Sequence, residues 1–389
     1  MSVADDEPLT EAWLRKRVWP RFARVRKEHR RIYLANHSLG RPPDRVAQDV
    51  QHALDVWYHD LGGAWTEWLA ARERFRALVA RLIGAKRPDL VVPKTSAGQG
   101  LRAVLNALEE EPRADKRRKL RVVASDGEFD SIDFILRVYR EKGRIDLRLM
   151  PWRDISVGNA DLLVLSSVMF ATGERVHGLN KMVRAARAAG ALVLLDVYHH
   201  AGALPLDVAA LAVDFAIGGS YKYLRGGPGA CWLYVRPGLV DTLRTLDTGW
   251  YAKHEPFAHE RPDPPQFGPG GDAWLESTPP VIAPVQAMAG LEITLELGVE
   301  RLRDYSLEQK QLLADLLRLR GVESEGTGED YGAFLTVAHP RADRLAAALA
   351  GRGVVADARG DRLRLCPDIL NSEGELAQCA EELGDLLRR

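Results

Sequence analysis

The sequence predicts an α/β protein with a large domain built on a mostly parallel central sheet and a small C-terminal α+β domain. Between about residues 90 and 235, short aliphatic runs alternate with segments of helical period. Uninterrupted apolar runs of this kind are typical of parallel strands that are covered on both faces. With 389 residues, of which 46% are hydrophobic, the chain is long enough for two domains and a large core.

An N-terminal arm is expected over residues 1–45. Residues 9–31 have the pattern of a mostly amphipathic helix, and Ile32-Tyr33-Leu34 reads as a short strand. Arginines and lysines from Arg21 to Arg31 fit a solvated helix face better than a nucleic-acid patch.

The large domain is expected to span residues 46–282. It opens with helical pattern over residues 44–84, interrupted at Gly62-Gly63. Strands are predicted at 120–123, 162–165, 192–195 and 215–217, and helices at 100–110, 130–142 and 179–189. Residues 252–272 are rich in Pro, Gly and His, which predicts a long functional loop.

The small domain is expected to span residues 283–389. One long helix is predicted from about 283 to 319, ending near Gly321. After it, strands at 334–337 and 362–365 alternate with helices at 342–351 and 373–388, which is an α+β pattern.

Charge and cysteine content exclude several classes of function. Lys+Arg and Asp+Glu both number 54, so no basic field predicts a nucleic-acid partner. The three cysteines form no C-x-x-C pair, which suits a reducing compartment, and no metal site is predicted. The acidic N-terminus lacks an apolar signal region and no apolar stretch is long enough to span a bilayer. We therefore expect a cytoplasmic protein without a membrane partner.

Two residues predict a cofactor. Lys222 lies in the glycine-rich segment Gly218 to Gly229, and Asp196 ends the apolar run that begins at Ala191. Pyridoxal 5′-phosphate (PLP) needs a lysine amine to hold its aldehyde and a carboxylate to keep its pyridine nitrogen protonated. The end of a buried parallel strand is where α/β sheets place ligands. Taken alone, Lys222 would be interpreted as a surface lysine and Asp196 as a helix cap. Together the two residues favour a PLP site.

Three further residues are candidates for contacts with this cofactor. Ser96 lies in a small-residue turn before a helix, where free N–H groups attract a phosphate, although an ordinary N-cap has the same pattern. Phe129 follows a predicted strand and could stack on the pyridine ring or simply pack in the core. His199 could orient the ring or Asp196, or be structural.

Later turns and the last strand add other candidates. Trp250 and Thr278 carry neutral donors that suit phosphate oxygens, though each could be a packing or turn residue. Arg362 and Arg364 alternate with leucines and share one strand face, where either could clamp a substrate carboxylate. The alternative for these arginines is a surface salt bridge.

Together these motifs resemble kynureninase, within the class V aminotransferase group of fold-type I PLP enzymes. Ser220 to Gly229 is similar to that family's S-Y-K-Y-L-N-G-G-P-G, with Arg225 in place of Asn. Asp196 to Gly202 is similar to its D-x-A-H-x-x-G, with Tyr198 in place of Ala. Other similar segments are Ile32 to Gly40 (I-Y-L-x-x-N-S-L-G, with His37 for Asn), Gly249-Trp250 (G-W) and Thr278-Pro279-Pro280 (T-P-P).

The resemblance implies a role for each candidate residue. Lys222 would hold the cofactor and act as the base, Asp196 would pair with the pyridine nitrogen, and Phe129 would stack on the ring. The phosphate would be bound by Ser96, the Ala97 N–H, Tyr221, Trp250 and Thr278. His199 would make another contact with the cofactor, and Tyr221 would also relay protons. The substrate would be bound by Ser38, Trp65 and Arg364 (or Arg362). It also implies a homodimer in which the partner chain completes the pocket.

Two segments depart from the family. Ser167, Met169, Phe170 and Ala171 stand where kynureninases carry His, Asn, Tyr and Arg, and the segment from Phe129 lacks F-P-T-D. We therefore expect a hydrolase that cleaves the Cβ–Cγ bond of a β-acyl α-amino acid other than kynurenine. The alternatives are a PLP-dependent aminotransferase or a β-eliminating, desulfurase-like lyase, and, less favoured, a non-catalytic PLP-fold protein.

Overall fold

A computed structural model describes residues 7–110 and 118–388. Its centre is a seven-stranded sheet of order β2-β8-β7-β6-β5-β3-β4, in which β8 alone runs antiparallel to its neighbours. The strands are β2 Val91–Lys94, β3 Leu120–Ser125, β4 Ile145–Met150, β5 Leu162–Ser166, β6 Leu192–Asp196, β7 Phe215–Gly219 and β8 Cys231–Val235. The predicted α/β class and mostly parallel sheet are confirmed, and β2, β4 and β8 are strands that the prediction did not include.

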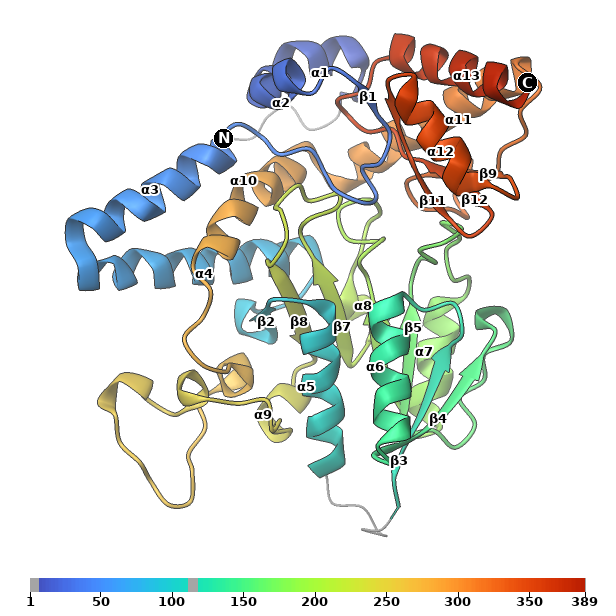
Figure 1. Cartoon of the computed structure of the whole chain (residues 1–389). Coiled ribbons are helices and arrows are strands. Elements are labelled where there is room, and N and C mark those ends of the chain that lie inside the picture. The colour runs from blue at the N-terminus through green and yellow to red at the C-terminus, as the bar shows by residue number, and fades with distance from the viewer. Residues whose placement is uncertain (1–6, 111–117, 389) are drawn as a thin grey trace.

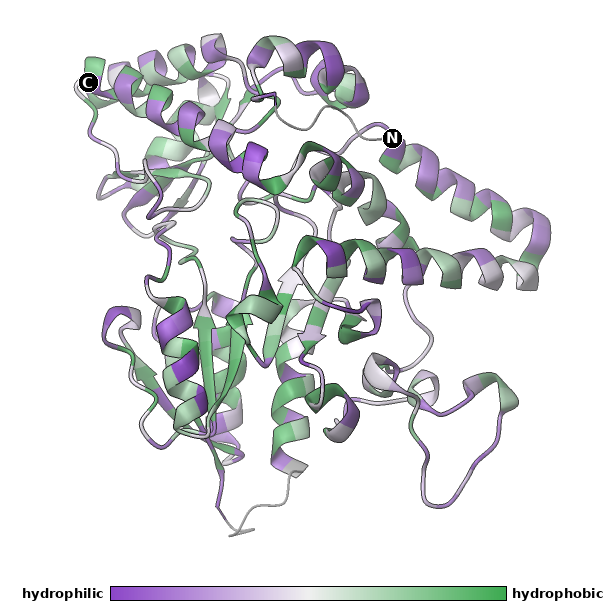
Figure 2. Ribbon diagram, turned by 180° about the vertical axis from the view of Figure 1, so that it is seen from behind, coloured by the Kyte–Doolittle hydropathy of each residue, from purple (hydrophilic) through white to green (hydrophobic). Residues whose placement is uncertain are grey.

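Helices cover both faces of this sheet. Figure 1 shows α5 (Ala97–Glu110) and α6 (Asp130–Glu141) on one face and α7 (Leu179–Ala188) on the other. Seen from behind in Figure 2, the strands are coloured as mostly hydrophobic, and β5, β7 and β8 are buried along their whole length. Burial on both faces is the physical reason why the strands read as unbroken apolar runs.

The C-terminal region has its own sheet and core. Strands β9 Leu335–Ala338, β11 Asp357–Arg359 and β12 Arg362–Leu365 form an antiparallel sheet covered by α12 (Ala342–Gly351) and α13 (Glu373–Leu387). The N-terminal strand β1 (Ile32–Tyr33) pairs with β10 (Val354–Val355), so the arm lies against this region. The boundaries after residues 45 and 282 stay predictions.

Two predicted helices are broken. The arm forms α1 (Glu11–Arg17), a 3₁₀ turn at Trp19–Phe22 and α2 (Ala23–Glu28), because Pro20 cannot continue the α-helical hydrogen bonding. The single helix expected over 283–319 is wrong: α10 (Ile282–Leu297) and α11 (Val299–Leu319) meet at an 83° bend. Gly298, with φ of 80°, occupies the bend in a conformation that other residues rarely adopt.

A helical hairpin projects from the body of the protein (Figure 1). It consists of α3 (Arg45–Asp60), a 3₁₀ turn at Leu61–Gly63 and α4 (Ala64–Leu82), which confirms the predicted break. Trp57, Tyr58 and Leu61 at its tip are 53%, 81% and 69% exposed. These three residues are called the hairpin tip below.

The remaining elements are short. They are α8 Val208–Leu211, α9 Leu239–Thr242, and 3₁₀ turns at Pro88–Leu90, Trp152–Asp154, Trp250–Ala252, Pro256–Ala258 and Gly270–Trp274. Within residues 7–110 and 118–388, no single helix is long and apolar enough to cross a membrane, although the bent pair α10 and α11 passes that test jointly on length and composition.

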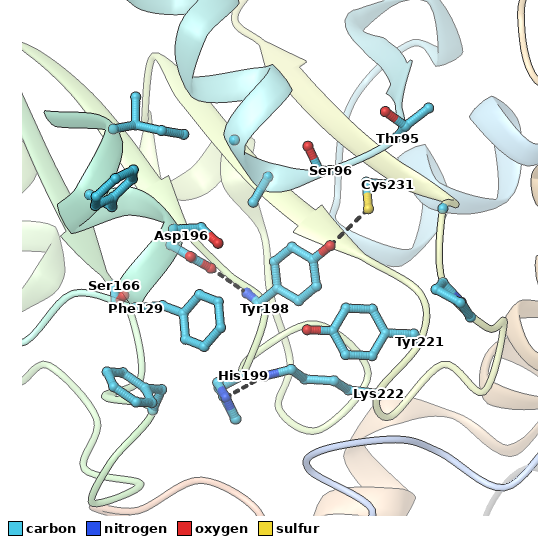
Figure 3. A pocket seen from close by; sticks show the side chains of 18 of the residues that line it. Thr95, Ser96, Phe129, Ser166, Asp196, Tyr198, His199, Tyr221, Lys222 and Cys231 are labelled. Carbon is cyan, nitrogen blue, oxygen red and sulfur yellow. Dashed lines mark hydrogen bonds between the residues drawn. The ribbon is translucent and has the colours of Figure 1, made fainter. Parts of the chain in front are cut away.

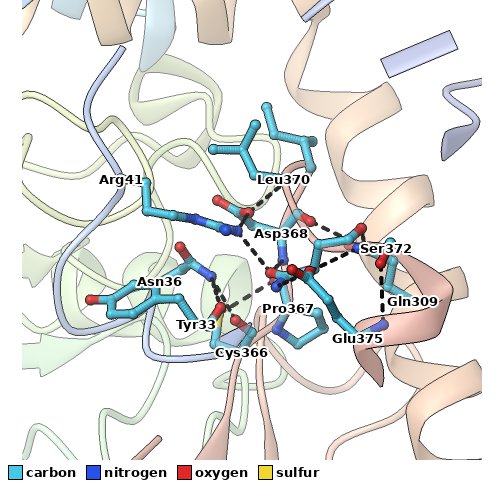
Figure 4. A network of polar contacts seen from close by, with 12 residues as sticks. Tyr33, Asn36, Arg41, Gln309, Cys366, Pro367, Asp368, Leu370, Ser372 and Glu375 are labelled. Atoms are coloured by element: carbon cyan, nitrogen blue, oxygen red, sulfur yellow. Dashed lines mark hydrogen bonds and ion pairs between the residues drawn. The ribbon is translucent and has the colours of Figure 1, made fainter. Parts of the chain in front are cut away.

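A largely buried carboxylate, Asp368, clamps the segment that contains Lys222. Asp368 accepts from Arg41 and, at 2.8 Å, from Nη2 of Arg225, which belongs to the glycine-rich segment and has φ of 55°. Figure 4 shows Arg41 reaching Asp368, and the same guanidinium donates to Oδ1 of Asn371 at 2.8 Å. Burial would raise the pKa of Asp368, but Arg41 and Arg225 outweigh it, and the pKa lies below its ordinary value.

We expect Asp368→Ala to lower the free energy of unfolding by about 3–5 kcal/mol, because it leaves two buried guanidinium groups without the carboxylate that balances their charge. Urea unfolding followed by circular dichroism measures this change. The matched control is Asp385→Ala, which removes an exposed carboxylate paired with Arg388 and should shift the midpoint little. Equal midpoints for the two variants would show that the clamp adds no stability.

Candidate functional site

A cavity of about 400 Å³ opens at the carboxyl ends of β5 and β6. This volume is in the range of small-molecule and cofactor sites, and its position is the usual one for ligands of α/β sheets. Figure 3 shows its walls. Its lining includes Thr95, Ser96, Ala97, Gly98, Arg102, Phe129, Ser166, Val168, Phe170, Asp196, Tyr198, His199, Tyr221, Lys222 and Cys231.

Lys222 reaches the cavity from the segment that follows β7. Its Nζ lies 2.5 Å from Nε2 of His199, and Nδ1 of that histidine lies 3.2 Å from the hydroxyl of Tyr223. Burial lowers the pKa of Lys222, while the charge of Asp196 partly opposes the shift. Burial also lowers the pKa of His199 well below its ordinary value. Both effects favour neutral groups, which leaves the amine free to react as a nucleophile or base.

Asp196 ends β6 and is 5% exposed. Its Oδ1 accepts a hydrogen bond of 2.8 Å from the backbone N–H of Tyr198. Burial raises its pKa, and the Tyr198 N–H and the charge of Lys222 act in the opposite direction. A carboxylate in this position gains stability from any cation that enters the cavity beside it.

The start of α5 forms another side of the cavity. Ser96 caps the helix, with Oγ accepting from the Gln99 N–H at 3.1 Å, and α5 begins at Ala97. The first N–H groups of a helix have no partner within the helix, and the dipole is positive at this end. Arg102, one turn further along α5, also lines the cavity. This side of the cavity is therefore suited to an anion such as a phosphate.

Several predicted site residues lie outside the cavity. Nε1 of Trp250 and Oγ1 of Thr278 are 3.3 Å apart and bond to each other. Trp65 packs against Trp68, with ring centroids 5.2 Å apart, near the hairpin tip. Ser38 lies in the segment that ends at Gly40, whose N–H donates to the Tyr221 carbonyl at 2.8 Å.

The two arginines of β12 are both paired. Arg364 is 3% exposed and forms a double contact with Asp357, at 2.8 Å from Nε and 2.7 Å from Nη2, and also donates to the Phe170 carbonyl. Arg362 pairs with Glu325 at 2.9 Å. A substrate carboxylate would have to compete with Asp357 for Arg364.

Residues that the prediction missed also surround the site. Glu128 is buried, and its oxygens accept from the N–H and hydroxyl of Ser166 at 2.9 and 2.6 Å. Burial raises the pKa of Glu128 to about 8. Tyr198 and Cys231 line the cavity, with the tyrosine hydroxyl 2.8 Å from Sγ. An acidic residue beside Phe129 and a tyrosine two residues after Asp196 were the available signals in the sequence.

Only part of the segment that departs from the kynureninase pattern reaches the cavity. Val168 and Phe170 line it, and the Phe170 ring meets Phe129 edge to face with centroids 5.3 Å apart. Met169 is 2% exposed and packs in the main core instead. Phe170 is therefore the substitution that changes the polarity of this wall.

Comparison with known proteins identifies the family. The profile described as Aminotransferase class-V matches residues 32–361. The chain belongs to the class-V aminotransferase family. Among relatives of this class-V protein, the kynureninase of Deinococcus radiodurans is 30% identical over 366 residues, covering 87% of this chain and 84% of that protein. The kynureninase of Pseudomonas fluorescens is 28% identical over 355 residues, covering 85% and 83%.

Solved structures agree on the fold of this class-V protein. A mutant of C-DES that has glycine covalently linked to its PLP cofactor superposes with a TM-score of 0.83 at 17% identity, covering 94% of this chain and 98% of that one. Apo cysteine desulfurase from Thermococcus onnurineus gives 0.78 at 18% identity, covering 94% and 98%. The fold is therefore that of fold-type I PLP enzymes.

The class-V protein is a kynureninase-like, PLP-dependent enzyme that acts on small amino-acid substrates, and hydrolysis of a carbon–carbon bond is the favoured reaction. Its cavity fits the cofactor: a buried amine, a buried carboxylate and a helix start lie around one space of sufficient volume. In the part of the chain that the structure describes, no cluster of three His, Cys, Asp or Glu could hold a metal.

Proposed function

We propose that this enzyme hydrolyses the Cβ–Cγ bond of a β-acyl α-amino acid, with PLP held between Lys222 and Asp196. The observation that supports it is that a buried amine and a buried carboxyl group line one cavity of about 400 Å³ in a kynureninase-like chain. When bound, the cofactor supplies an electron sink for negative charge that develops at the substrate Cα.

The roles of the other residues are also proposals. In this assignment Phe129 covers one face of the ring, and the start of α5 at Ser96 and the Ala97 N–H receives the phosphate. His199 contacts the cofactor beside Lys222, and Tyr221 assists proton transfer. Five further residues do not line the cavity of the single chain. We assign Trp250 and Thr278 to the phosphate across a dimer interface, and Trp65, Ser38 and Arg364 to the substrate.

Protein groups would move the protons of the reaction. Lys222 Nζ, released when substrate binds, accepts the proton from Cα, since burial favours its neutral form. His199, whose Nε2 lies 2.5 Å from Nζ, orients that amine. Water then supplies the OH that bonds to the acyl carbon and a proton for Cβ as the Cβ–Cγ bond breaks. The proton held on Lys222 Nζ returns to Cα, giving a carboxylic acid and alanine.

The apolar wall around Phe170 predicts the preferred side chain. We expect kynurenine to be a poor substrate and β-benzoylalanine, which lacks only the ring amine, to be preferred by roughly 10-fold or more in kcat/KM. Burying an amine without a hydrogen-bond partner costs about 1–3 kcal/mol, and one factor of ten corresponds to about 1.4 kcal/mol. Steady-state assays with both substrates, reading alanine and the aromatic acid, measure the ratio.

The matched variant is Phe170→Tyr, which restores a polar group on the same wall and should narrow the preference. Efficient hydrolysis of kynurenine by the unaltered enzyme would contradict the substrate prediction. The same product analysis tests the reaction class. A keto acid without alanine would mean transamination, and ammonia with an unsaturated or sulfur product would mean β-elimination.

We also propose a homodimer, supported by the exposed hairpin tip and by the site residues that lie outside the cavity of one chain. Exposed clusters of large apolar side chains mark interaction surfaces. Sedimentation should give about twice the 43.2 kDa chain mass. Tyr58→Glu should shift the protein towards monomer and reduce turnover, because burying an unpaired charge is costly.

Leu319→Glu is the matched control for the dimer. Leu319 is 82% exposed at the end of α11, away from the hairpin tip, so this charge should leave the mass unchanged. A fully active monomer at assay concentration would remove the dimer proposal.

The location in the cell is also a proposal. The three buried cysteines, none of which forms a disulfide, support a reducing, cytoplasmic location.

A further inference from the structure

Tyr198 is a large aromatic residue at the position where the family pattern D-x-A-H has alanine. Its N–H donates to Asp196 Oδ1 at 2.8 Å, which ties its backbone to the carboxylate at the end of β6. Its ring lines the cavity and lies 5.4 Å from the Tyr221 ring at a 50° tilt. The side chain therefore occupies space beside the cofactor site that an alanine would leave open.

The sheet makes room for this ring. A Cβ at Gly219 would lie 2.0 Å from the Tyr198 hydroxyl oxygen and 2.3 Å from Cζ, so only glycine is compatible with the observed ring position. Cys231, directly opposite Gly219 in the pairing of β7 with β8, meets the hydroxyl through Sγ at 2.8 Å. The ring is thus seated against the ends of two strands and anchored at its far end.

The anchor is a neutral contact. Burial raises the pKa of Tyr198 beyond its usual range and the pKa of Cys231 to about 11. Hydroxyl and thiol therefore both keep their protons at neutral pH. The surface that Tyr198 presents to the cavity is an uncharged aromatic face.

Phe129 and Tyr198 both line the cavity that also contains the lysine and the aspartate. The Nζ atom of Lys222 lies 5.7 Å from the centroid of each ring and at the same distance from the Tyr221 ring. In Figure 3 the two rings stand on opposite sides of the path from Lys222 to Asp196. A planar group that is bonded to Nζ and directed towards Asp196 passes between the two rings.

We propose that Tyr198 is a cofactor-binding residue that forms the second aromatic wall of a slot for the pyridine ring, with Phe129 as the first wall. Gly219 leaves space for the Tyr198 ring, and Cys231 holds its hydroxyl. The inference rests on the proposed function, since it takes PLP as the ligand. Aromatic faces stack favourably on one another, and an electron-rich ring also attracts a protonated pyridine. The slot therefore binds the ring on both faces.

The test measures cofactor binding by apoprotein rather than turnover. Purified apoproteins are titrated with PLP, and the dissociation constant is read from quenching of protein fluorescence, with the visible circular dichroism band as a second readout. Tyr198→Leu keeps most of the volume but removes the aromatic face, and it should weaken PLP binding roughly 10-fold and reduce the visible dichroism. Tyr198→Phe keeps the face and should bind within about threefold of the unaltered protein.

A second variant tests the space that Gly219 leaves for the Tyr198 ring. Gly219→Ala should weaken PLP binding in the unaltered background, because its Cβ displaces the ring into the slot. In the Tyr198→Leu background the same change should have little further effect, since the clash is gone. Thermal unfolding of each apoprotein verifies that the fold is retained.

The outcomes separate the two proposals. If the unaltered apoprotein shows no visible band with PLP, the proposed function fails. If it binds PLP while folded Tyr198→Leu binds equally tightly with the same dichroism, the second aromatic wall is overturned and the proposed function stands.

Discussion

Lys222→Ala should abolish turnover, with a loss of at least ~10⁴-fold, and should remove covalent attachment of PLP. Three lysines are buried in the described part of the chain, namely Lys94, Lys222 and Lys310, and only Lys222 lines the cavity. Lys94 is held by the Trp274 carbonyl and Glu276, and Lys310 by the carbonyls of Gly326 and Gly332. Among the described residues, no other amine is therefore placed to hold the aldehyde.

Peptide mass spectrometry after borohydride reduction measures this directly. The reduced cofactor should be recovered on Lys222 in the unaltered enzyme and on no lysine in the variant. Lys181→Ala, an exposed change on α7, is the control and should leave both labelling and turnover intact. Recovery of the cofactor on Lys94 or Lys310 would overturn the assignment.

Asp196→Asn should retain some PLP but lose at least ~10³-fold in turnover. The amide is nearly the same size and can still accept from the Tyr198 N–H, so the local fold should persist. It carries no negative charge, however, and a neutral group cannot hold the pyridine nitrogen protonated. The rate should therefore fall much further than cofactor affinity, as turnover and PLP titration would show together.

Asp214→Asn is the matched control for this charge. Asp214 is also fully buried and pairs with Arg236 at 2.8 Å, but it lies at the start of β7, at the end of the sheet away from the cavity. Removing the charge of Asp214 should lower the free energy of unfolding. The turnover rate, measured per folded enzyme molecule, should change little. Near-normal turnover in Asp196→Asn would show that another group carries the charge.

Much of the site was predictable because its key residues follow strands. Asp196 ends an apolar run and Lys222 lies soon after the next one, and parallel pairing of β6 with β7 brings both to one edge of the sheet. Cys231 was not predictable in this way. It reaches the cavity because β8 enters antiparallel between β2 and β7, and sequence periodicity does not encode strand order.

The break at Gly298 illustrates a second limit. The pattern on either side is helical, and an isolated glycine within such a pattern is often tolerated at a cost of about 1 kcal/mol. The bend follows from what α10 must contact: Ile293 and Leu297 pack with the N-terminal arm, while Leu313 and Leu317 of α11 belong to the C-terminal core. A residue that accepts φ of 80° permits the change of direction, but only the tertiary contacts require it.

We expect the Asp368 clamp to form late in folding. Arg41 lies in the arm, Arg225 beside the lysine, and Asp368 after β12, the last strand. Contacts between residues so far apart form late, because the intervening chain must first be closed into loops. An intermediate with only the central sheet assembled would leave the lysine segment unclamped. Cofactor capture is then a late event, and the rate at which refolding protein acquires its visible band reports docking of the C-terminal region.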